Sequence, residues 1–546
     1  MKRFVKCFIT ASCTVSLLAS CGNEKGPQMM KDNNKAPQML GDFHGTTYEI
    51  YVGSFYDASG DGMGDLKGVL EKLDYINDGN DKTDSDLGCD SIWLMPVMPS
   101  PTYHKYDVTD FFNIDPAYGT LEDFKTLSDT MHDRGMKLLF DLPLNHTSSK
   151  HPWFLTACEY LKNLPEGAQP SAKECPEFGY YYFTDSKVHP DYYYSVPGTD
   201  WFYEGKFWSE MPDLNLENDE LFKEIEKILT FWQENGVDGF RLDAVKEFIS
   251  DNTEKNVAIL KRIKDIVYAN NPEAYIVGEA WTAYSTFSRY YKSEVPSFFN
   301  FAFGTRDGYI AKTLNGATNS GAASFGIMIE KVNDAIKTNT ADYIDAPFYT
   351  NHDTPRSYTY YKGDNITEKV KMAEGMNLLM SGNAFLYYGE EFGMKSGGID
   401  EEKRMPMPWG GSYGKDGVCY PPTGAGSVDL PLGTYADQKD DPYSVYNFVK
   451  QVIKIRNANP EIARGETTNV AELSDKNISA LKKTYNDSAL YIIYNLGSEE
   501  QVLELNEKAP DLKISEKCGS LQTGDAPVTY KNGTLTLPPY SAAILK

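Results

Sequence analysis

Acidic side chains follow short apolar segments of the sequence, and their types suit chemistry on a sugar. Asp243 ends the segment Gly239–Asp243, two residues after Arg241, and Glu279 follows the segment Tyr275–Gly278. A cation beside a carboxylate keeps that carboxylate ionised, whereas a Glu after an apolar strand can have a raised pKa and donate a proton. One proton donor and one nucleophile, roughly 5–5.5 Å apart, cleave a glycosidic bond with retention of configuration.

Two more segments of the same kind end in acids and imidazoles. Asp353 follows His352 after the segment 346–350, and the segment that begins at Lys137 runs through Asp141 to His146. A single acid in such a place is better explained as a helix cap or a solvated loop charge. That explanation becomes poor for three acids, one arginine and two histidines that all follow predicted strands. Together they indicate one catalytic site.

These residues need a framework that brings the ends of the strands together. Eight short apolar segments alternate with longer amphipathic stretches, which is typical of parallel strands joined by helices. The pattern predicts an α/β fold, a (β/α)8 TIM barrel, in which catalytic groups stand at the carboxyl ends of the strands. The predicted strands are Tyr48–Val52, Ser91–Pro96, Lys137–Leu142, Gly239–Asp243, Tyr275–Gly278, Phe298–Phe301, Ala346–Thr350 and Ala384–Tyr388, and the predicted helices include Leu121–Arg134, Leu221–Asn235 and Phe448–Asn457.

The spacing of these segments divides the chain. About ninety-five residues separate the third and fourth predicted strands, too many for a simple crossover, so an inserted domain is expected there. After the last barrel helix, short alternating strands predict a small antiparallel β-sandwich; they are Ala489–Tyr494, Gln501–Leu505, Gly533–Leu537 and Ala542–Leu545. We expect the barrel at 46–144 and 209–460, the insertion at 145–208 and the sandwich at 461–546, after a signal peptide at 1–20 and a tether at 21–45.

The first residues have the pattern of an export signal. A basic start, residues 1–6, precedes an apolar run that ends at Leu18 and is too short to span a bilayer, and Cys21 follows closely. This resembles a bacterial lipobox, which implies a lipid on Cys21 and a lipoprotein anchored in the outer membrane, at the cell surface or at the periplasmic face. An ordinary signal peptide with a chance cysteine is the alternative.

The composition narrows the class of partner. The 546 residues include 53 basic and 78 acidic side chains, a formal net charge of −25, which argues against nucleic acid as a partner. We expect a monomer. The cysteines that remain after export form no CxxC pair, so a thiolate metal site is not expected. Cys158 and Cys175 flank one polar segment and are either a disulfide in an oxidising compartment or free thiols.

The motifs together resemble the signature regions of the α-amylase family, glycoside hydrolase family 13. They are Asp141–His146, Gly239–Lys246, Val277–Glu279 and Asn351–Asp353, with a fifth, Met211–Asn215, at the end of the insertion. All occur in the order of that family, and the resemblance runs from about Thr47 to Ala542. It implies a catalytic TIM barrel, an inserted domain B after the third strand and a C-terminal antiparallel β-sandwich.

The resemblance also implies a role for each matching residue. Asp243 would be the nucleophile, Glu279 the general acid and then the base, and Asp353 would stabilise the positively charged sugar through its hydroxyls. Arg241 would orient Asp243. At the −1 sugar, His146 and His352 would donate or accept hydrogen bonds, Tyr106 would stack under the ring, and Arg356 would belong to the same subsite. Lys246 would reach the +1/+2 side.

The segment Asp57–Asp65 has oxygen-bearing side chains at alternate positions and glycines that permit sharp turns, although it lacks the twelfth-position acid of an EF-hand. It resembles the loop after the first barrel strand in oligo-1,6-glucosidases. That resemblance implies a mainly structural Ca²⁺, and a turn without metal is the alternative. The implied ligands are Asp57, Ser59, Asp61, Asp65 and the Met63 carbonyl. A departure at Glu247, where many α-amylases have a histidine, argues against their second calcium site.

The substrate is inferred from the details of two motifs. Met211–Asn215 is similar to the subfamily between oligo-1,6-glucosidases and neopullulanases, and Ala244 and Lys246 resemble α-1,4-acting members. The resemblance therefore implies an α-amylase-type hydrolase of starch, maltooligosaccharides or cyclodextrins. An exo-acting α-glucosidase or oligo-1,6-glucosidase and a transglycosylase of the same family are alternatives. A non-catalytic glycan-binding lipoprotein is a remote one, because it predicts the loss of a catalytic acid and all three are present.

Overall fold

A closed parallel barrel forms the centre of the protein. The computed structural model describes residues 42–80, 82–165, 167–250, 252–426 and 429–546. The barrel strands are β1 (Thr46–Ile50), β2 (Ser91–Leu94), β3 (Lys137–Leu142), β7 (Gly239–Leu242), β8 (Tyr275–Gly278), β9 (Ser297–Phe298) and β10 (Ala384–Tyr387). They pair in the order β10-β1-β2-β3-β7-β8-β9, all in parallel. The strands are buried on both faces, as parallel strands covered by helices must be.

The seventh position of the barrel differs from the prediction. Ala346–Thr350 is not a regular strand; only two isolated parallel bridges, Phe299 to Ala346 and Phe348 to Phe385, join β9 to β10 and close the barrel. Pro347 lies between the bridging residues and has no N–H to donate to a ladder, which explains the interruption. Its carbonyl still accepts a hydrogen bond from the Phe385 N–H at 2.8 Å.

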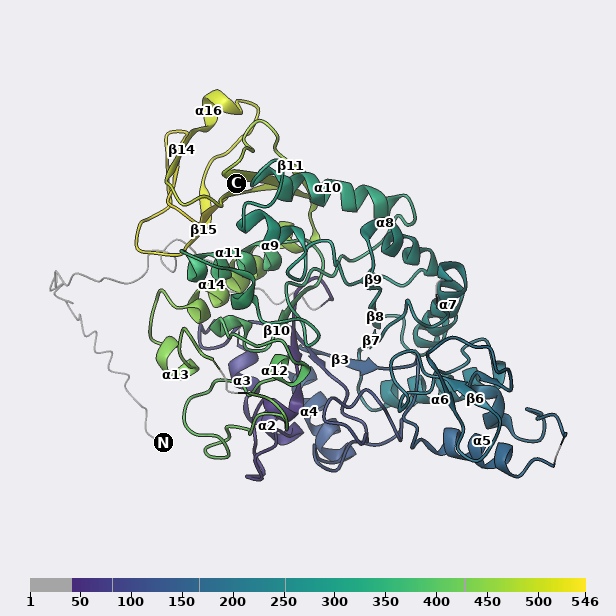
Figure 1. Ribbon diagram of the computed structural model, residues 1–546. Coiled ribbons are helices and arrows are strands. Elements are labelled where there is room, and N and C mark those ends of the chain that lie inside the picture. The colour runs from purple at the N-terminus through teal and green to yellow at the C-terminus, as the bar shows by residue number, and fades with distance from the viewer. Residues whose placement is uncertain (1–41, 81, 166, 251, 427–428) are drawn as a thin grey trace, which may run out of the picture.

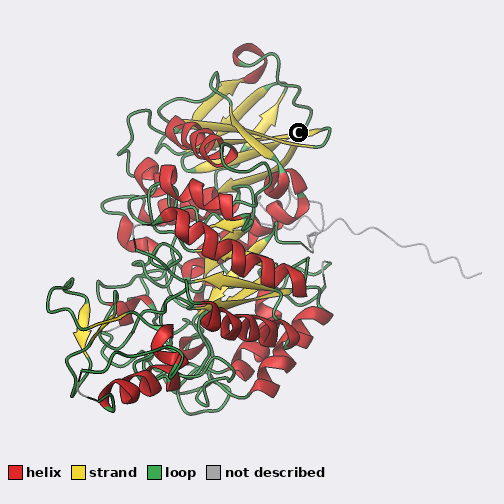
Figure 2. Cartoon of the chain, turned by 90° about the vertical axis from the view of Figure 1, so that its right-hand side faces the viewer, coloured by secondary structure: helices red, strands yellow, loops and turns green. Residues whose placement is uncertain are grey.

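Helices surround the barrel and cover its outer face (Figures 1 and 2). The longer ones begin at polar caps; Thr120 forms a capping box with Asp123, and Asn218 caps the helix that leads into β7. The helices of the barrel domain are α2 (Leu66–Glu71), α3 (Leu73–Ile76), α4 (Leu121–Asp133), α6 (Asp219–Glu234), α7 (Thr253–Asn270), α8 (Tyr284–Phe287), α9 (Tyr309–Leu314), α10 (Ala323–Lys337), α11 (Ile366–Leu378), α12 (Asp400–Lys403), α13 (Tyr435–Gln438), α14 (Val445–Ala458) and α15 (Pro460–Arg464).

An insertion follows β3 and carries a helix and a small antiparallel sheet. These are α5 (Pro152–Lys162), β4 (Phe183–Thr184), β5 (Tyr193–Ser195) and β6 (Phe202–Glu204), with strand order β4-β6-β5. Its aromatic side chains largely pack on one another; the Phe154 ring lies edge-on to Tyr181 at 5.1 Å and to Tyr203 at 4.8 Å. The insertion lies at the lower right of Figure 1, away from the C-terminal strands at the top.

The C-terminal part is antiparallel, as predicted for a β-sandwich. A five-stranded sheet has the order β11-β12-β13-β18-β15 and a three-stranded sheet the order β14-β17-β16. Ile478, Leu503 and Leu535 belong to a separate hydrophobic cluster between them. The elements are β11 (Glu466–Asn469), β12 (Ile478–Tyr485), β13 (Ser488–Asn495), β14 (Gln501–Glu504), α16 (Leu505–Lys508), β15 (Lys517–Gln522), β16 (Thr529–Lys531), β17 (Thr534–Leu537) and β18 (Ser541–Leu545).

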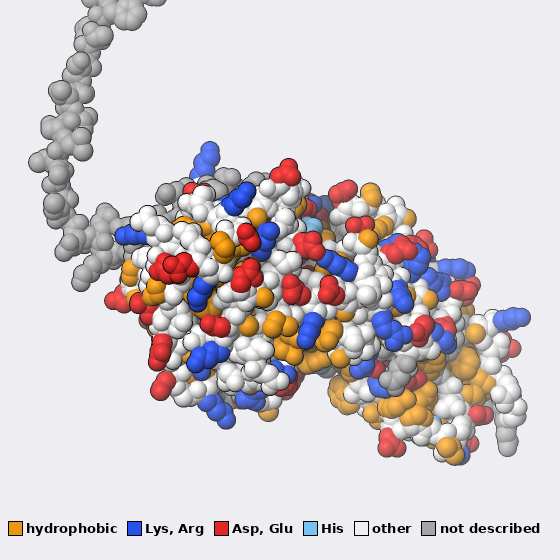
Figure 3. Space-filling view, turned by 90° about the horizontal axis from the view of Figure 1, so that it is seen from above, with side chains coloured by type: hydrophobic (Ala, Val, Ile, Leu, Met, Phe, Trp, Pro, Cys, Tyr) orange, Lys and Arg blue, Asp and Glu red, His pale blue; other side chains and the backbone are white. Residues whose placement is uncertain are grey.

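Cys158 and Cys175 are separate thiols in the structure, so the disulfide alternative is not formed. In the part of the chain that the structure describes, no helix is both long and apolar enough to cross a bilayer. Acidic and basic side chains are interspersed over the face that Figure 3 shows. The predicted signal peptide and Cys21 lie outside the described residues.

Candidate active site

A pocket of about 400 Å³ opens at the carboxyl ends of the barrel strands. It brings together five residues that the sequence predicts for the site: Tyr106, His146, Asp243, Glu279 and Asp353. The remaining lining residues are His104, Phe207, Met211, Ala244, Trp281, Asp400 and Arg404. Because the parallel strands all end at this rim, segments far apart in the sequence meet in one pocket.

The guanidinium of Arg241 lies directly beneath the pocket and is fully buried. Its Nη1 is 2.7 Å from Asp243 Oδ1, its Nη2 is 3.0 Å from Glu279 Oε2, and Nη1 also donates to Asp141 Oδ1 at 2.9 Å. Arg241 and Asp243 are two residues apart at the end of β7 and therefore point to the same side. One cation thus holds both pocket carboxyls close together.

Glu279 combines burial with limited charge compensation. Burial raises the pKa of Glu279 to about 7; the charges of Asp243 and Asp353 act in the same direction and Arg241 opposes them. The N–H of Ala244 donates to Glu279 Oε2 at 3.0 Å and fixes the carboxyl. Ala244 has a φ of 46°, a left-handed backbone conformation that turns this N–H toward the pocket. Glu279 is therefore suited to carry a proton near neutral pH.

Asp353 is held in the opposite protonation state. Burial would raise its pKa, but the His352 charge and hydrogen bond, together with Arg404, keep the pKa well below its usual range. His352 Nε2 lies 3.1 Å from Asp353 Oδ2 and 2.7 Å from the Tyr106 hydroxyl. On the other ring edge, His352 Nδ1 lies 2.6 Å from Glu49 Oε1. Burial would lower the pKa of His352, but the charges of Asp353 and Glu49 raise it to about 10.

Sequence reasoning missed a charged cluster on the other side of Asp353. Arg404 Nη2 lies 3.2 Å from Asp353 Oδ1. Its Nη1 forms an ion pair with Asp400 and donates a hydrogen bond to the Tyr103 hydroxyl oxygen at 3.2 Å. Tyr103 also donates to Asp400. Asp400 and Arg404 are four residues apart at the short α12, a spacing typical of helical ion pairs, and this was the available signal. Glu49 was missed as well, although it is the acid of an otherwise uncharged buried strand.

Four predicted residues do not line the pocket. Arg241 and His352 lie behind it and contact its acids, as described above. Lys246 instead pairs with Glu247 at 3.1 Å, with its side chain partly exposed. Arg356 is fully buried; its Nη1 lies 3.4 Å from Glu390 Oε1 and its guanidinium stacks 4.0 Å from the Tyr387 ring. The structure thus does not bring Arg356 to the −1 subsite, and Arg404 is the arginine beside Asp353.

Two aromatic side chains form the open walls of the pocket. Trp281 is 47 % exposed and stacks on Phe301 with ring centroids 4.9 Å apart, and Phe207 is 50 % exposed and meets the His146 ring edge-on at 5.4 Å. Exposed faces of this kind suit the apolar face of a sugar ring. Burial lowers the pKa of His146, which keeps this imidazole neutral against the charge of Asp243.

The predicted calcium loop contains carboxylates that accept hydrogen bonds from the loop's own backbone. The Asp57 carboxylate accepts hydrogen bonds from the backbone N–H groups of Gly60 and Gly62. The Asp61 carboxylate accepts one from the Met63 N–H, and the Asp65 carboxylate accepts one from the Ser59 N–H. Burial raises the pKa of the Cys419 thiol, and the charges of Asp57, Asp65 and Asp61 act in the same direction. These oxygen donors are of the type that Ca²⁺ binds. The described residues nevertheless include no group of three His, Cys, Asp or Glu side chains arranged to hold a metal.

Comparisons with known proteins agree with this geometry. A family model described as the α-amylase catalytic domain matches residues 49–465, and one described as the α-amylase SusG C-terminal domain matches residues 478–544. The solved structure of Eubacterium rectale Amy13B is 46% identical with a TM-score of 0.91, and the match covers 95% of this chain and 99% of that chain. Alpha-amylase 3 of Dictyoglomus thermophilum is 34% identical over 504 residues, 91% of this chain and 92% of its own length. An α-amylase structure from H. orenii is 33% identical with a TM-score of 0.77, covering 92% and 99%. The chain belongs to the α-amylase family, glycoside hydrolase family 13.

Proposed function

We propose that the protein hydrolyses α-1,4-glucosidic bonds of starch, maltooligosaccharides or cyclodextrins by double displacement with retention of configuration. The observation that carries the proposal is the pair of carboxyls on one guanidinium: Arg241 contacts Asp243 at 2.7 Å and Glu279 at 3.0 Å. Two acids that share one guanidinium are neighbours in the pocket, and a close pair of carboxyls favours the retaining mechanism over the inverting one, which needs a wider gap for water.

In the first step, Asp243 attacks the anomeric carbon and forms a glycosyl ester, while Glu279 gives its proton to the leaving oxygen. A pKa of about 7 supports Glu279 as the proton donor. In the second step, the Glu279 carboxylate takes a proton from water, which attacks the ester and releases the sugar with its original configuration. Arg241 orients both acids throughout and is a positioning residue.

Asp353 stabilises the positive charge of the sugar in both transition states. The low pKa of its carboxyl supports an anionic group at all working pH values. Tyr106, whose hydroxyl donates to Asp141 Oδ2 at 3.0 Å, is proposed to stack under the −1 sugar, and His146 to hydrogen-bond its hydroxyls. We assign Lys246 to the more distant +1/+2 side only, and Arg356 to the support of the barrel wall.

The test is the set of products made by the mature protein. Cleavage of a blocked chromogenic maltoheptaoside is expected from an endo-acting hydrolase, and an exo-acting α-glucosidase would leave it intact. Amylose, pullulan, cyclodextrin and sucrose, with the products sized, distinguish hydrolysis of α-1,4 bonds from α-1,6 cleavage and from transglycosylation. The α-anomer as first product, followed by NMR, is expected for retention; the β-anomer would overturn the mechanism.

We also propose a structural Ca²⁺ held by Asp57, Ser59, Asp61, Asp65 and the Met63 carbonyl. The support is the run of oxygen-bearing side chains at alternate positions of the loop, and a bound cation would balance their charge and tie the loop to the barrel. A chelator should lower the Tm, and added Ca²⁺ should restore it. The substitution Asp61→Asn should abolish this response, whereas Asp133→Asn at the exposed end of α4 should keep it. A Tm that is insensitive to the chelator would contradict the metal.

For localisation, we propose an exported, monomeric lipoprotein anchored to a bacterial membrane through Cys21. The support is the pattern of residues 1–21, a basic start and a short apolar run before the cysteine. Labelled palmitate should be incorporated into the wild type, and Cys21→Ala should move the protein to the soluble fraction. Protease shaving of whole cells then distinguishes the cell surface from the periplasmic face.

A further inference from the structure

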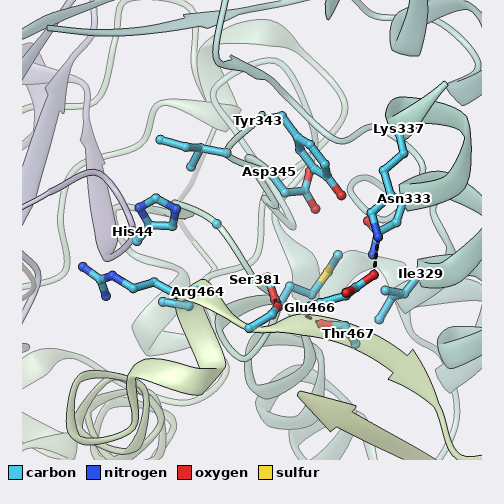
Figure 4. A pocket seen from close by; sticks show the side chains of 15 residues that line it. His44, Ile329, Asn333, Lys337, Tyr343, Asp345, Ser381, Arg464, Glu466 and Thr467 are labelled. Atoms are coloured by element: carbon cyan, nitrogen blue, oxygen red, sulfur yellow. Dashed lines mark hydrogen bonds and ion pairs between the residues drawn. The ribbon is translucent and has the colours of Figure 1, made fainter. Parts of the chain in front are cut away.

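A cavity of about 230 Å³ lies at the amino-terminal end of the barrel strands, away from the catalytic pocket (Figure 4). Its ionic groups have partners within the protein, since Lys337 pairs with Glu466 and Arg464 with Asp42. The groups that can act on the catalytic acids lie at the other, carboxyl end of the strands. There, the segment around Arg404 is held to the barrel in an unusual way.

The segment that carries Arg404 has no regular structure to fix it. Arg404 is the first residue after the short helix α12, and residues 405–409 form neither helix nor strand. Two of them, Pro406 and Pro408, have no backbone N–H, and a proline also disfavours helical backbone in the residue before it. A helix or a sheet ladder therefore cannot hold this segment in place, and side chains of the barrel must do so.

Three side-chain hydroxyls of the barrel donate to three consecutive carbonyls of this segment. We call the hydroxyls of Ser54, Tyr387 and Tyr388 the hydroxyl clamp. All three residues are buried, so water has little access to the hydrogen bonds that they form. The pairs are Tyr387 with the Lys403 carbonyl at 3.0 Å, Ser54 with the Arg404 carbonyl at 2.7 Å, and Tyr388 with the Met405 carbonyl at 2.7 Å. The backbone on both sides of Arg404 is thereby tied to the barrel.

We propose that the hydroxyl clamp consists of positioning residues that hold Arg404 against Asp353, an inference that rests on the proposed function. The Arg404 carbonyl is the central acceptor of the clamp, and its Nη2 lies 3.2 Å from Asp353 Oδ1. At the far end of the side chain, Nη1 contacts Asp400 and the Tyr103 hydroxyl. Backbone and guanidinium are thus fixed separately. In this position Arg404 favours the anionic form of Asp353, which stabilises the positively charged sugar.

Arg356 holds the two tyrosines of the clamp from behind. Its guanidinium lies 4.0 Å from the centre of the Tyr387 ring and 4.9 Å from that of Tyr388. The two rings meet edge to face with centroids 4.9 Å apart. Burial raises the pKa of both tyrosines, so their hydroxyls remain hydrogen-bond donors. Arg356 therefore acts on the catalytic pocket through Tyr387 and Tyr388 and does not contact the sugar.

The test removes the two tyrosine hydroxyls and keeps the rings. In the full-length mature protein, Tyr387→Phe/Tyr388→Phe, the clamp variant, retains the stacking on Arg356. Its kcat/KM on a p-nitrophenyl maltooligoside should fall about tenfold, because two hydrogen bonds that position Arg404 are lost. In the Arg404→Gln background, the same double substitution should change kcat/KM by about twofold or less, since its effect passes through Arg404. A clamp that only supports the fold would give the same loss in both backgrounds.

A second variant and a pH profile complete the test. Ser54→Ala removes the third hydroxyl without a change to either ring and should lower kcat/KM in the same direction. In both variants the acid limb of the kcat/KM profile should move to higher pH, because burial raises the pKa of Asp353 and Arg404 is one of the cations that lower it. The matched control is Tyr530→Phe, which loses a hydroxyl that donates to the Ile514 carbonyl in the C-terminal part and should behave like the parent.

Other outcomes overturn the inference. An equal fall of kcat/KM with and without Arg404→Gln would show that the clamp does not act through Arg404. Parental kcat/KM in a clamp variant that melts like the parent, or an acid limb that stays at the parental pH, has the same consequence. If the clamp variant does not fold, parental activity of Ser54→Ala overturns the inference instead. A parent protein that hydrolyses no α-glucan refutes the proposed function, a result separate from all of these.

Discussion

Replacing Glu279 with glutamine should have opposite effects on activity and on stability. Glutamine keeps an acceptor oxygen for the Ala244 N–H and the Arg241 guanidinium, which contact Glu279 Oε2 at 3.0 Å each. It has nearly the same size but cannot transfer a proton. The substitution therefore changes the chemistry of the pocket while the contacts that hold the side chain persist.

The loss of activity follows from general acid catalysis. This contributes roughly 10²–10⁴-fold to a rate, and the same side chain also serves as base in the second step, so kcat on maltooligosaccharides should fall by about three orders of magnitude or more. In the wild type, kcat/KM should decline above pH 7, since the pKa of Glu279 is about 7 and only the protonated form donates. A maltosyl fluoride, whose leaving group needs little protonation, should be affected much less in its first step.

The raised pKa of Glu279 also means that the glutamine variant should be more stable than the wild type at high pH. A carboxyl whose pKa rises from about 4.5 in the unfolded chain to about 7 in the fold binds more protons when folded, so stability falls as the pH rises between these values. At 1.36 kcal/mol per unit, the wild type should lose roughly 3 kcal/mol from pH 5 to pH 8 at this one group. The glutamine variant has no such group and should melt above the wild type at pH 8, with little difference at pH 5.

Two measurements decide the matter: kcat/KM from pH 5 to pH 9 on a p-nitrophenyl maltooligoside, and thermal melts over the same range. Glu122→Gln, an exposed acid on α4, is the control and should change neither. Near-normal activity in Glu279→Gln would refute the assignment of the acid. Melting curves of wild type and variant that shift in parallel with pH would refute the account of its pKa.

Three further substitutions test the surroundings of Asp353 and the pocket wall. Glu49→Gln removes one of the two anions that raise the pKa of His352. The pKa of His352, followed by NMR, should therefore fall, and kcat/KM should drop about 10–100-fold. An unchanged pKa of His352 would contradict the proposed network. Arg404→Gln removes the ion pair at 3.2 Å from Asp353 and should lower kcat/KM by a similar factor, and full activity would show that His352 alone suffices. Trp281→Ala should raise KM for maltooligosaccharides about 2–10-fold and leave kcat nearly unchanged, since the half-exposed ring is placed to contact the sugar and not the reacting groups. A fall in kcat alone would count against this role.

The barrel could be predicted from the sequence because its strands are short, apolar and buried on both faces. β3 and β8 begin and end where the pattern indicates. The pattern fails where polar residues occupy strands. β12 contains Lys482 and Lys483 in succession, and Lys483 is fully buried because its ammonium donates to Ile462, Ser381 and Thr467 oxygens. Periodicity cannot indicate a strand whose buried lysine is satisfied by partners distant in the sequence.

The site residues could likewise be predicted where the spacing along one strand places them, and not where the closed barrel brings distant segments together. Arg241 and Asp243 could be paired from their spacing alone, since alternate residues of a strand point to one side. Arg404 could not, because only the closed barrel brings the segment after β10 beside the loop that carries Asp353. Arg356 shows the converse error: a position three residues after Asp353 suggested the pocket, but the chain turns there and buries the guanidinium against Tyr387 and Glu390.

The unequal distribution of counter-charges explains how one pocket holds carboxyls in two protonation states. Asp353 lies between two cations of its own, His352 at 3.1 Å and Arg404 at 3.2 Å. Glu279 shares the single guanidinium of Arg241 with Asp243 and with Asp141. Burial acts on both acids, but only Asp353 has enough compensation to remain charged, so Glu279 keeps its proton up to a pH of about 7. The residues behind the acids therefore decide which carboxyl is the stabilising anion and which is the proton donor. Glu49 and His352 matter most, because Glu49 keeps His352 charged and the charge of His352 keeps Asp353 ionised.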